Sequence, residues 1–207
     1  RDLHSFPTRR SSDLTNGLGA ASPAGRLGGP TTPRHPGEGV GKRRGAGHTG
    51  PMRIYIPATA ADLSAPEISA RPAHAATAQL ARALPEEDEE GLEMSASLCA
   101  ADASLVLLAG PSADGAADRR IVIAADVDAG AVRELAVGPD VLPGTVELLA
   151  PVSWDDVAAL LVDEERAEAD VRAARTGDEG AFERAADADL LWFDVSERAP
   201  LAERLGA

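Results

Sequence analysis

The sequence predicts an α/β domain, an α+β sandwich in which one mixed sheet of about four to six strands packs against a long helix and several short helices. Two observations indicate strands: the alternating run MRIYIPA at 52–58 and the apolar run RRIVIAADV at 119–127. A third observation is the helical stretch at 87–109 that separates these two runs. Strands interleaved with helices of modest length are typical of this fold class.

The first strand is predicted at 52–58, because Ile54 and Ile56 fall on one face of an alternating run that Pro57 closes. A short helix, a brief strand and a second helix are expected next. They are placed at 60–64, 67–71 and 74–84.

The longest helix is predicted at 87–109. Carboxylates of the EEDEE run at 86–90 stabilise a helix start, where backbone N–H groups are unpaired. Gly110 and Pro111 end the helix. The apolar stripe expected to be buried consists of Leu92, Leu98, Cys99, Leu105, Val106 and Leu108.

The second half predicts a strand at 119–127 whose continuous apolarity indicates a central position in a covered sheet. Ser153 is a predicted N-cap of a short helix, and Gly177 separates two further helices. Further strands are expected at 145–152, 160–163 and 190–195, and helices at 154–159, 165–175, 181–186 and 197–205. The aromatic residues Trp154, Phe182, Trp192 and Phe193 are expected to be core anchors.

Charge divides the chain at Met52. The first 51 residues hold 8 of the 20 Lys and Arg and 3 of the 34 Asp and Glu, which leaves 12 basic and 31 acidic residues in 52–207. That acidic part contains no lysine, so it lacks the basic face that nucleic-acid binding requires. A basic protein is the partner that such a surface favours.

Residues 1–51 are expected to be disordered and non-native, and Met52 is the expected translation start. The segment HSFPTRRSSDL at 4–14 resembles the translation of a widely used DNA-sequencing adapter, and residues 1–3 extend the resemblance. The stretch from Thr15 to Pro51 is dense in Gly, Pro, Ser and Arg, with almost no large apolar residue. Such a segment cannot bury enough surface to offset its ordering entropy. Residues 52–207 are expected to form a single compact domain.

The acidic part resembles an uncharacterised family of small proteins from high-GC actinobacteria, a domain of unknown function. The resemblance rests on MRIYIPAT, GLEMSASLCAADASLVLLA, RRIVIAADV, PVSWDDVAALLVDE and LLWFDVSE, which together cover most of 52–197. It supports the start at Met52 and a bacterial cytoplasmic location, and it implies no catalytic or binding residue.

Few residues offer catalytic chemistry. His74 is the one histidine of 52–207, and its place near a predicted helix start favours a solvated or capping role. Cys99, the one cysteine, falls in the predicted buried stripe and is expected to act as a small hydrophobe. With one cysteine the chain forms no intramolecular disulfide and no cysteine-based zinc site.

Asp126 and Asp128 are the candidate metal ligands, because a D-x-D pair at the end of an apolar strand is where α/β enzymes often hold a metal. Carboxylates at 155, 156 and 163–165 would complete such a site in space. The competing interpretation is that an acidic chain forms carboxylate clusters by chance. No histidine and no longer ligand pattern supports the metal.

Two functions from different classes remain. The favoured one is a non-enzymatic interaction or regulatory module in the cytoplasm, with no cofactor, whose acidic surface binds a basic protein. The alternative is a small metal-dependent hydrolase or transferase that uses Asp126 and Asp128. No apolar run was found that approaches the roughly 20 residues of a membrane span, so no membrane contact is expected. Oligomeric state is left open.

Overall fold

The computed structural model describes residues 50–110 and 117–207, which belong to one compact unit, Gly47–Ala207. The described strands form one seven-stranded sheet in the order β4-β5-β2-β1-β3-β6-β7, and all neighbours pair antiparallel. The strands are β1 (Pro51–Ala58), β2 (Pro72–His74), β3 (Ile121–Asp128), β4 (Val132–Glu134), β5 (Thr145–Leu148), β6 (Val157–Asp163) and β7 (Leu190–Phe193).

Six α-helices and several 3₁₀ turns connect the described strands. The α-helices are α1 (Ala60–Leu63), α2 (Ala78–Ala83), α3 (Glu89–Leu108), α4 (Glu168–Ala174), α5 (Glu179–Ala186) and α6 (Arg198–Arg204). The 3₁₀ turns are η3 (Ala129–Ala131), η4 (Trp154–Asp156), η5 (Glu165–Ala167) and η6 (Val195–Glu197).

The two strongest strand patterns form the centre of the sheet. β1 pairs with β3 over eight residues, from Pro51 opposite Asp128 to Ala58 opposite Ile121. Every residue of β3 from Ile121 to Ala125 is buried, and β6 pairs along its other edge. The predicted central position of this strand is therefore confirmed, since an apolar run buried on both faces needs neighbours and cover on each side.

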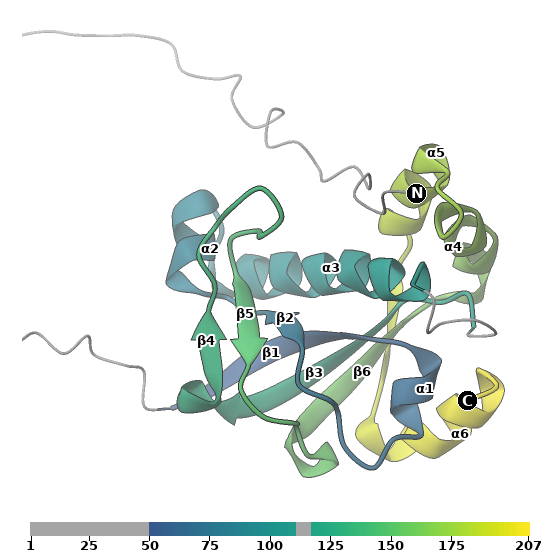
Figure 1. The fold of residues 1–207 in the computed structure, drawn as a ribbon, viewed down its shortest axis with the longest axis horizontal. Helices are drawn as coiled ribbons and strands as arrows, with labels where there is room; N and C mark the ends of the chain where they lie inside the picture. The colour runs from purple at the N-terminus through teal and green to yellow at the C-terminus, as the bar shows by residue number, and fades with distance from the viewer. Residues whose placement is uncertain (1–49, 111–116) are drawn as a thin grey trace, which may run out of the picture. The chain divides into compact units, whose positions relative to one another are not determined.

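Helices cover both faces of this sheet (Figure 1). α3 crosses one face, where Ala96, Ala100 and Ala101 pack against Tyr55 and Val122. On the opposite face, which carries Ile54 and Ile56, the core includes Leu63 of α1 and Leu201 of α6. The alternation of β1 thus supplies two cores, one for each layer of helices.

The buried face of α3 differs from the predicted stripe. Leu105 and Leu108 are buried as expected, but the other buried residues are small. Those small residues are Ala96, Ser97, Ala100, Ala101 and Ser104, while Met94, Leu98, Val106 and Leu107 are exposed. Small side chains let the helix lie close to the strands. Ser104 Oγ accepts from Ile121 N at 3.0 Å and donates to Ala58 O at 2.7 Å.

α3 has the length and apolar composition of a membrane-spanning helix, although no such segment was expected from the sequence. Among the described residues, α3 alone is long and apolar enough to cross a membrane, judged by length and composition. Here α3 packs on the sheet, and the core helices of soluble proteins satisfy the same test.

Several predicted elements are corrected. The α/β class is confirmed, but the sheet is antiparallel rather than mixed and has seven strands rather than four to six. β2 and β4 escaped prediction because three residues are too short to show a period. In place of the strand at 67–71 there is one isolated bridge between Ile68 and Val152.

Helix boundaries also shift. The helix expected at 74–84 begins at Ala78, where the Thr77 side chain caps it by accepting from Gln79 N and Leu80 N. The helix expected at 154–159 is only the turn η4, and β6 begins at Val157. Gly177 ends α4 as predicted, in a left-handed conformation with a φ of 96° that glycine tolerates.

Residues 1–51 were predicted to be disordered. Residues 1–49 lie outside the described residues, so this stays a prediction. The first strand includes Pro51, one residue before the predicted start at Met52.

Candidate functional site

A pocket of about 820 Å³ lies at one end of the sheet, and its volume is in the range of small-molecule and side-chain binding sites. Five segments line it: the start of β1, the turn into α2, the first turns of α3, the stretch from the end of β3 through β4, and β5. Met52 and Val132, which are partly exposed, supply apolar surface. The pocket therefore combines an apolar wall with charged groups.

Four carboxylates line this acidic pocket, namely Glu89, Glu93, Asp128 and Glu134. Glu89 and Glu93 are one helical turn apart on α3, which begins with Asp88 accepting from Gly91 N. Asp128 caps η3 by accepting from Gly130 N at 3.1 Å. These carboxylates therefore project from a helix start, a strand end and the edge strand β4.

The one arginine of the pocket wall is already bonded to a carboxylate. Arg53 donates from Nε and Nη2 to the two Asp126 oxygens, at 2.6 and 2.9 Å. This fork-to-carboxylate geometry is a strong charge-assisted pair. Arg53 also interacts electrostatically with Glu93, but its hydrogen bonds go to Asp126, so among the described residues the four carboxylates of the pocket outnumber the single cation of its wall.

Glu93 and Glu134 accept further hydrogen bonds. Tyr55 Oη donates to Glu93 Oε2 at 3.3 Å, and burial together with the Glu93 charge raises the pKa of Tyr55 to about 12. Gln79 N donates to Glu134 Oε1 at 3.4 Å. These contacts orient the carboxylates without neutralising their charge.

The predicted metal candidates sit at this same end of β3. The hydrogen bonds from Arg53 lower the pKa of Asp126, so its carboxylate is held in the charged form by a guanidinium. Asp128 lines the acidic pocket. Among residues 50–110 and 117–207, no group of three or more His, Cys, Asp or Glu is placed to hold a metal ion.

His74 lies elsewhere than expected. It belongs to β2 rather than to a helix start, pairs with Tyr55 of β1, and is 7% exposed. Burial lowers the pKa of His74 to about 4. Its Nδ1 has no hydrogen-bond partner within the described part of the chain. The predicted solvated or capping role is therefore wrong, and His74 is a neutral core residue.

The other side chains singled out by sequence have mixed outcomes. Cys99 is half-buried on α3 rather than part of the buried stripe. Trp154 packs against the core, donates from Nε1 to Ala65 O at 2.9 Å and stacks under Arg198. Phe182 and Phe193 are partly buried against core clusters. Trp192, in contrast, is 62% exposed, so it is not the core anchor that was predicted.

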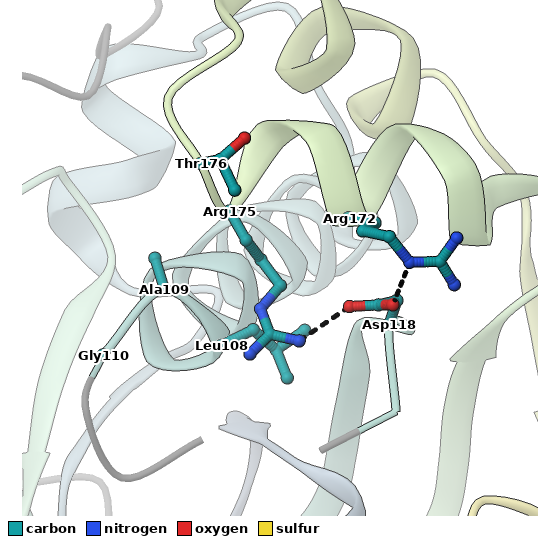
Figure 2. Close-up of a pocket in the computed structure, with 7 residues that line it drawn as sticks. All are labelled: Leu108, Ala109, Gly110, Asp118, Arg172, Arg175 and Thr176. Carbon is teal, nitrogen blue, oxygen red and sulfur yellow. Dashed lines mark hydrogen bonds and ion pairs between the residues drawn. The ribbon is translucent and has the colours of Figure 1, made fainter. Parts of the chain in front are cut away.

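A second pocket, of about 290 Å³, lies where the end of α3 approaches α4 (Figure 2). Figure 2 shows Arg172 and Arg175 on either side of Asp118, each with a nitrogen 2.6 Å from one of its oxygens. One carboxylate shared by two guanidinium groups gives this site nearly balanced charge. It is smaller than the acidic pocket and has a weaker field for a charged ligand.

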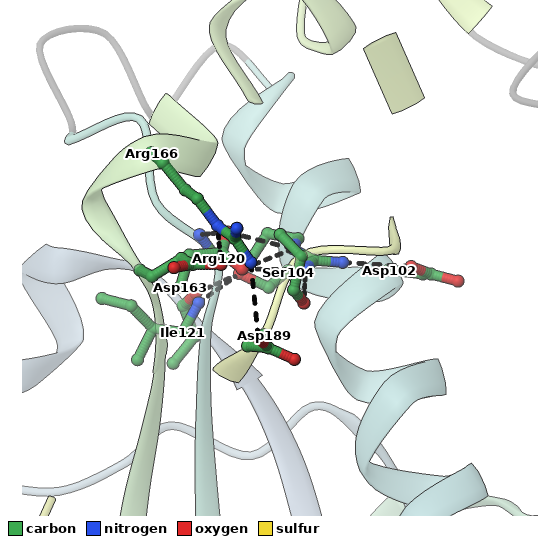
Figure 3. A network of polar contacts seen from close by, with 10 residues as sticks. Asp102, Ser104, Arg120, Ile121, Asp163, Arg166 and Asp189 are labelled. Atoms are coloured by element: carbon green, nitrogen blue, oxygen red, sulfur yellow. Dashed lines mark hydrogen bonds and ion pairs between the residues drawn. The ribbon is translucent and has the colours of Figure 1, made fainter. Parts of the chain in front are cut away.

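A buried ion pair lies between α3 and the sheet (Figure 3). Arg120 and Asp163 are 1% and 0% exposed, and Arg120 Nη2 lies 2.8 Å from Asp163 Oδ1. Arg120 also approaches Asp102 at 3.5 Å and donates to Ala188 O at 3.3 Å. Burial raises the pKa of Asp163, and Arg120 opposes that change. The network links α3, β3, β6 and the segment before β7, so its role is structural.

Sequence reasoning found one of the four pocket carboxylates. Asp128 was named as a site residue, whereas Glu89 was seen only as part of a helix start. The spacing of Glu89 and Glu93 was an available signal, because residues four apart share one helix face. Glu134 gave no local signal, since it lies on a three-residue strand.

Comparison with known proteins places the chain in a family. A family of unknown function, DUF6912, matches residues 52–202. Comparison with curated proteins and with solved structures returned no match. The matched range begins at the second residue of β1 and ends within α6, so it includes nearly all of the described fold. The chain therefore belongs to the family of unknown function DUF6912.

Proposed function

We propose that this domain is a non-enzymatic interaction module whose acidic pocket receives a basic side chain of a partner protein. The observation that carries the proposal is the set of four carboxylates around a pocket of about 820 Å³ whose only arginine is bonded to Asp126. A lysine or arginine head group would bind one or two of those carboxylates, and its aliphatic stem would contact Met52 and Val132.

The charge of the whole domain supports a basic partner. Nine of its twelve arginines form ion pairs with carboxylates within the described residues. Two more, Arg198 and Arg204, lie over aromatic rings. Eleven of the twelve arginines are therefore engaged within the molecule, while 31 acidic residues leave a large negative excess. Such a field steers basic partners toward the surface.

The metal-dependent alternative finds less support. Asp126 is engaged by Arg53, and Asp128 lacks two further ligands nearby among the described residues. A divalent cation needs several oxygen ligands in one place. Interaction with a basic group needs only the charge that the acidic pocket already has.

The test is a pull-down with the tagged full chain from a lysate of the organism that encodes it, at about 50 and about 300 mM NaCl. Bound proteins are identified by mass spectrometry and rebound as purified partners. A pocket variant carries Glu89→Gln, Glu93→Gln, Asp128→Asn and Glu134→Gln. A charge-matched control carries Glu86→Gln, Asp140→Asn, Glu179→Gln and Glu203→Gln, all on exposed residues outside the pocket wall.

The expected result is one stoichiometric partner that is released as salt rises, is lost with the pocket variant and is retained by the charge-matched control. Equal loss with both variants would assign binding to overall charge rather than to the pocket. Salt-insensitive binding, or an empty pull-down from folded protein, would reject the proposal.

A further inference from the structure

The last strand of the sheet, β7, has a free outer edge. It pairs with β6 on one side through Leu160–Phe193, Leu161–Trp192, Val162–Leu191 and Asp163–Leu190. No other strand in the described residues pairs with its second side. An unpaired edge presents a row of backbone N–H and C=O groups to which another extended segment can bond.

This edge is only four residues long, but it lacks the side chains and backbone irregularities that usually block such pairing. Lysine, proline and bulges commonly protect edge strands, but β7 reads LLWF and its pairing with β6 is regular. Leu191 and Trp192 are 44% and 62% exposed. Being adjacent on a strand, they point to opposite faces of the sheet, so the edge offers apolar contact on both faces. Tryptophan is also among the residues that most often dominate binding energy at interfaces.

The charges that flank β7 select the occupant. Asp189 precedes the strand, is 80% exposed and lies 3.4 Å from Arg166, which also pairs with Glu164, so this end keeps a net negative charge. Asp194 follows the strand and accepts from Ser196 N and Oγ. In an antiparallel pair of two β7 strands in full register, Asp189 of each copy would face Asp194 of the other. Like charges directly opposite each other destabilise a strand pair, so a second copy is disfavoured. Basic residues at both ends of an incoming strand would be complementary.

We propose that the outer edge of β7 binds an extended segment of a partner protein, in which about four residues with apolar alternation lie between two basic residues. The backbone of that segment extends the sheet by one strand. Its alternate side chains contact Trp192 on the α3 face and Leu191 on the α6 face, and its basic ends approach Asp189 and Asp194. This surface is separate from the acidic pocket, and the proposal does not rest on the proposed function.

The test uses fluorescence anisotropy with the full chain and a labelled synthetic peptide, Arg-Val-Thr-Val-Thr-Arg, whose four central residues match the length of β7. Two versions of the peptide carry N-methyl groups on one or the other alternating set of amides. A strand that adds to one edge uses only one of these sets, so methylation of that set should abolish binding and methylation of the other should preserve it. This comparison leaves the protein unchanged.

Protein variants test the side chains. Trp192→Ser should weaken binding by about tenfold or more, while Val137→Ser, at an equally exposed apolar residue outside β7, should leave it unchanged. Replacing both peptide arginines by glutamate should also weaken binding by about tenfold or more at low salt. The pocket variant should bind the peptide normally, which keeps this proposal separate from the pocket.

Three results would overturn the inference. One is no binding at about 1 mM peptide, and another is binding that is equally sensitive to both methylated sets. The third is a concentration-dependent dimer in sedimentation velocity that Trp192→Ser disrupts, because this would identify a second copy as the occupant.

Discussion

Identical charged residues behave differently in this molecule because their surroundings differ. The Arg120–Asp163 pair is almost fully buried, whereas the side chains of Arg133 and Glu147 are 65% and 39% exposed. Removing a charge from water costs several kcal/mol per ion, and only a well-bonded partner offsets that cost. Asp163 accepts from Arg120 Nε, Nη2 and backbone N, which satisfies the buried guanidinium.

Asp163→Ala is expected to lower the free energy of unfolding by about 3–5 kcal/mol, because it leaves the Arg120 charge buried without its main partner. Glu147→Ala, at the exposed pair, should cost less than about 1 kcal/mol. Urea denaturation of both variants measures the contrast. If Asp163→Ala and Glu147→Ala lowered the free energy of unfolding by similar amounts, Arg120 would have to be hydrated in solution. The double variant Arg120→Met with Asp163→Leu should recover most of the stability, because no buried charge then remains.

His74 predicts how stability changes with pH. The pKa of its imidazole is about 4 in the folded protein and 6.5 in an unfolded chain, so between these values the unfolded chain binds a proton that the folded protein does not. The free energy of unfolding is therefore highest above pH 6.5 and falls as the pH drops toward 4. This group contributes a loss of about 3 kcal/mol across that window.

The measurement is urea denaturation between pH 7.5 and pH 4 of the wild type and of His74→Gln, a range that spans the titration. The difference in free energy of unfolding between wild type and His74→Gln should shrink as pH falls. Only the wild type loses the stability that His74 contributes. Histidines outside the described residues cancel in this difference. A difference that stays constant with pH would show that the pKa of His74 is the same in the folded protein and the unfolded chain.

At the scale of elements, pattern predicted long segments and failed on short or atypical ones. β1 and β3 were predicted because eight residues show clear alternation or continuous apolarity. β2 and β4 were not, because their three residues become strands only by pairing with distant segments, β2 with β1 and β5 and β4 with β5. The acidic pocket follows the same rule: it gathers residues from five segments, and local sequence showed only Asp128 as a candidate.

The α3 helix shows why its buried face could not be predicted. Apolar residues occur around the whole helix, so the apolar pattern defines no single face. The distance between helix and sheet determines which residues are buried. Alanine and serine fit between the helix and the strands, and larger residues are directed to solvent. The rule that large apolar residues are buried therefore selected the wrong side for Leu98 and Val106.

This arrangement predicts an inverted sensitivity along α3. Ala100→Leu is expected to destabilise the fold by about 1–3 kcal/mol, because Ala100 is fully buried against the sheet and has no room for a larger side chain. Met94→Ser, at an exposed site, should change the free energy of unfolding by no more than about 0.5 kcal/mol. Chemical denaturation of the two single variants measures both. A larger loss for Met94→Ser than for Ala100→Leu would contradict the described orientation of the helix.

At the scale of the whole molecule, negative charge opposes folding. The ion-paired arginines contact 11 carboxylates within the described residues, out of 31 acidic residues in 52–207. The remaining carboxylates repel one another over distances comparable to the Debye length, and salt screens such exposed charges most strongly. Ion pairs that are buried or in direct contact are screened less.

Salt should therefore stabilise this protein. Raising NaCl from about 20 to about 500 mM is expected to raise Tm by several degrees, because long-range repulsion weakens more than the short arginine contacts do. The variant Glu86→Gln, Asp140→Asn, Glu203→Gln should have a higher Tm than the wild type at low salt. It should also respond less to added salt, since its three replaced residues are exposed carboxylates. Thermal denaturation followed by circular dichroism measures both effects. A Tm that falls as NaCl rises would mean that attraction within the arginine–carboxylate pairs outweighs repulsion among the carboxylates. The acidic residues would then stabilise the fold through these pairs.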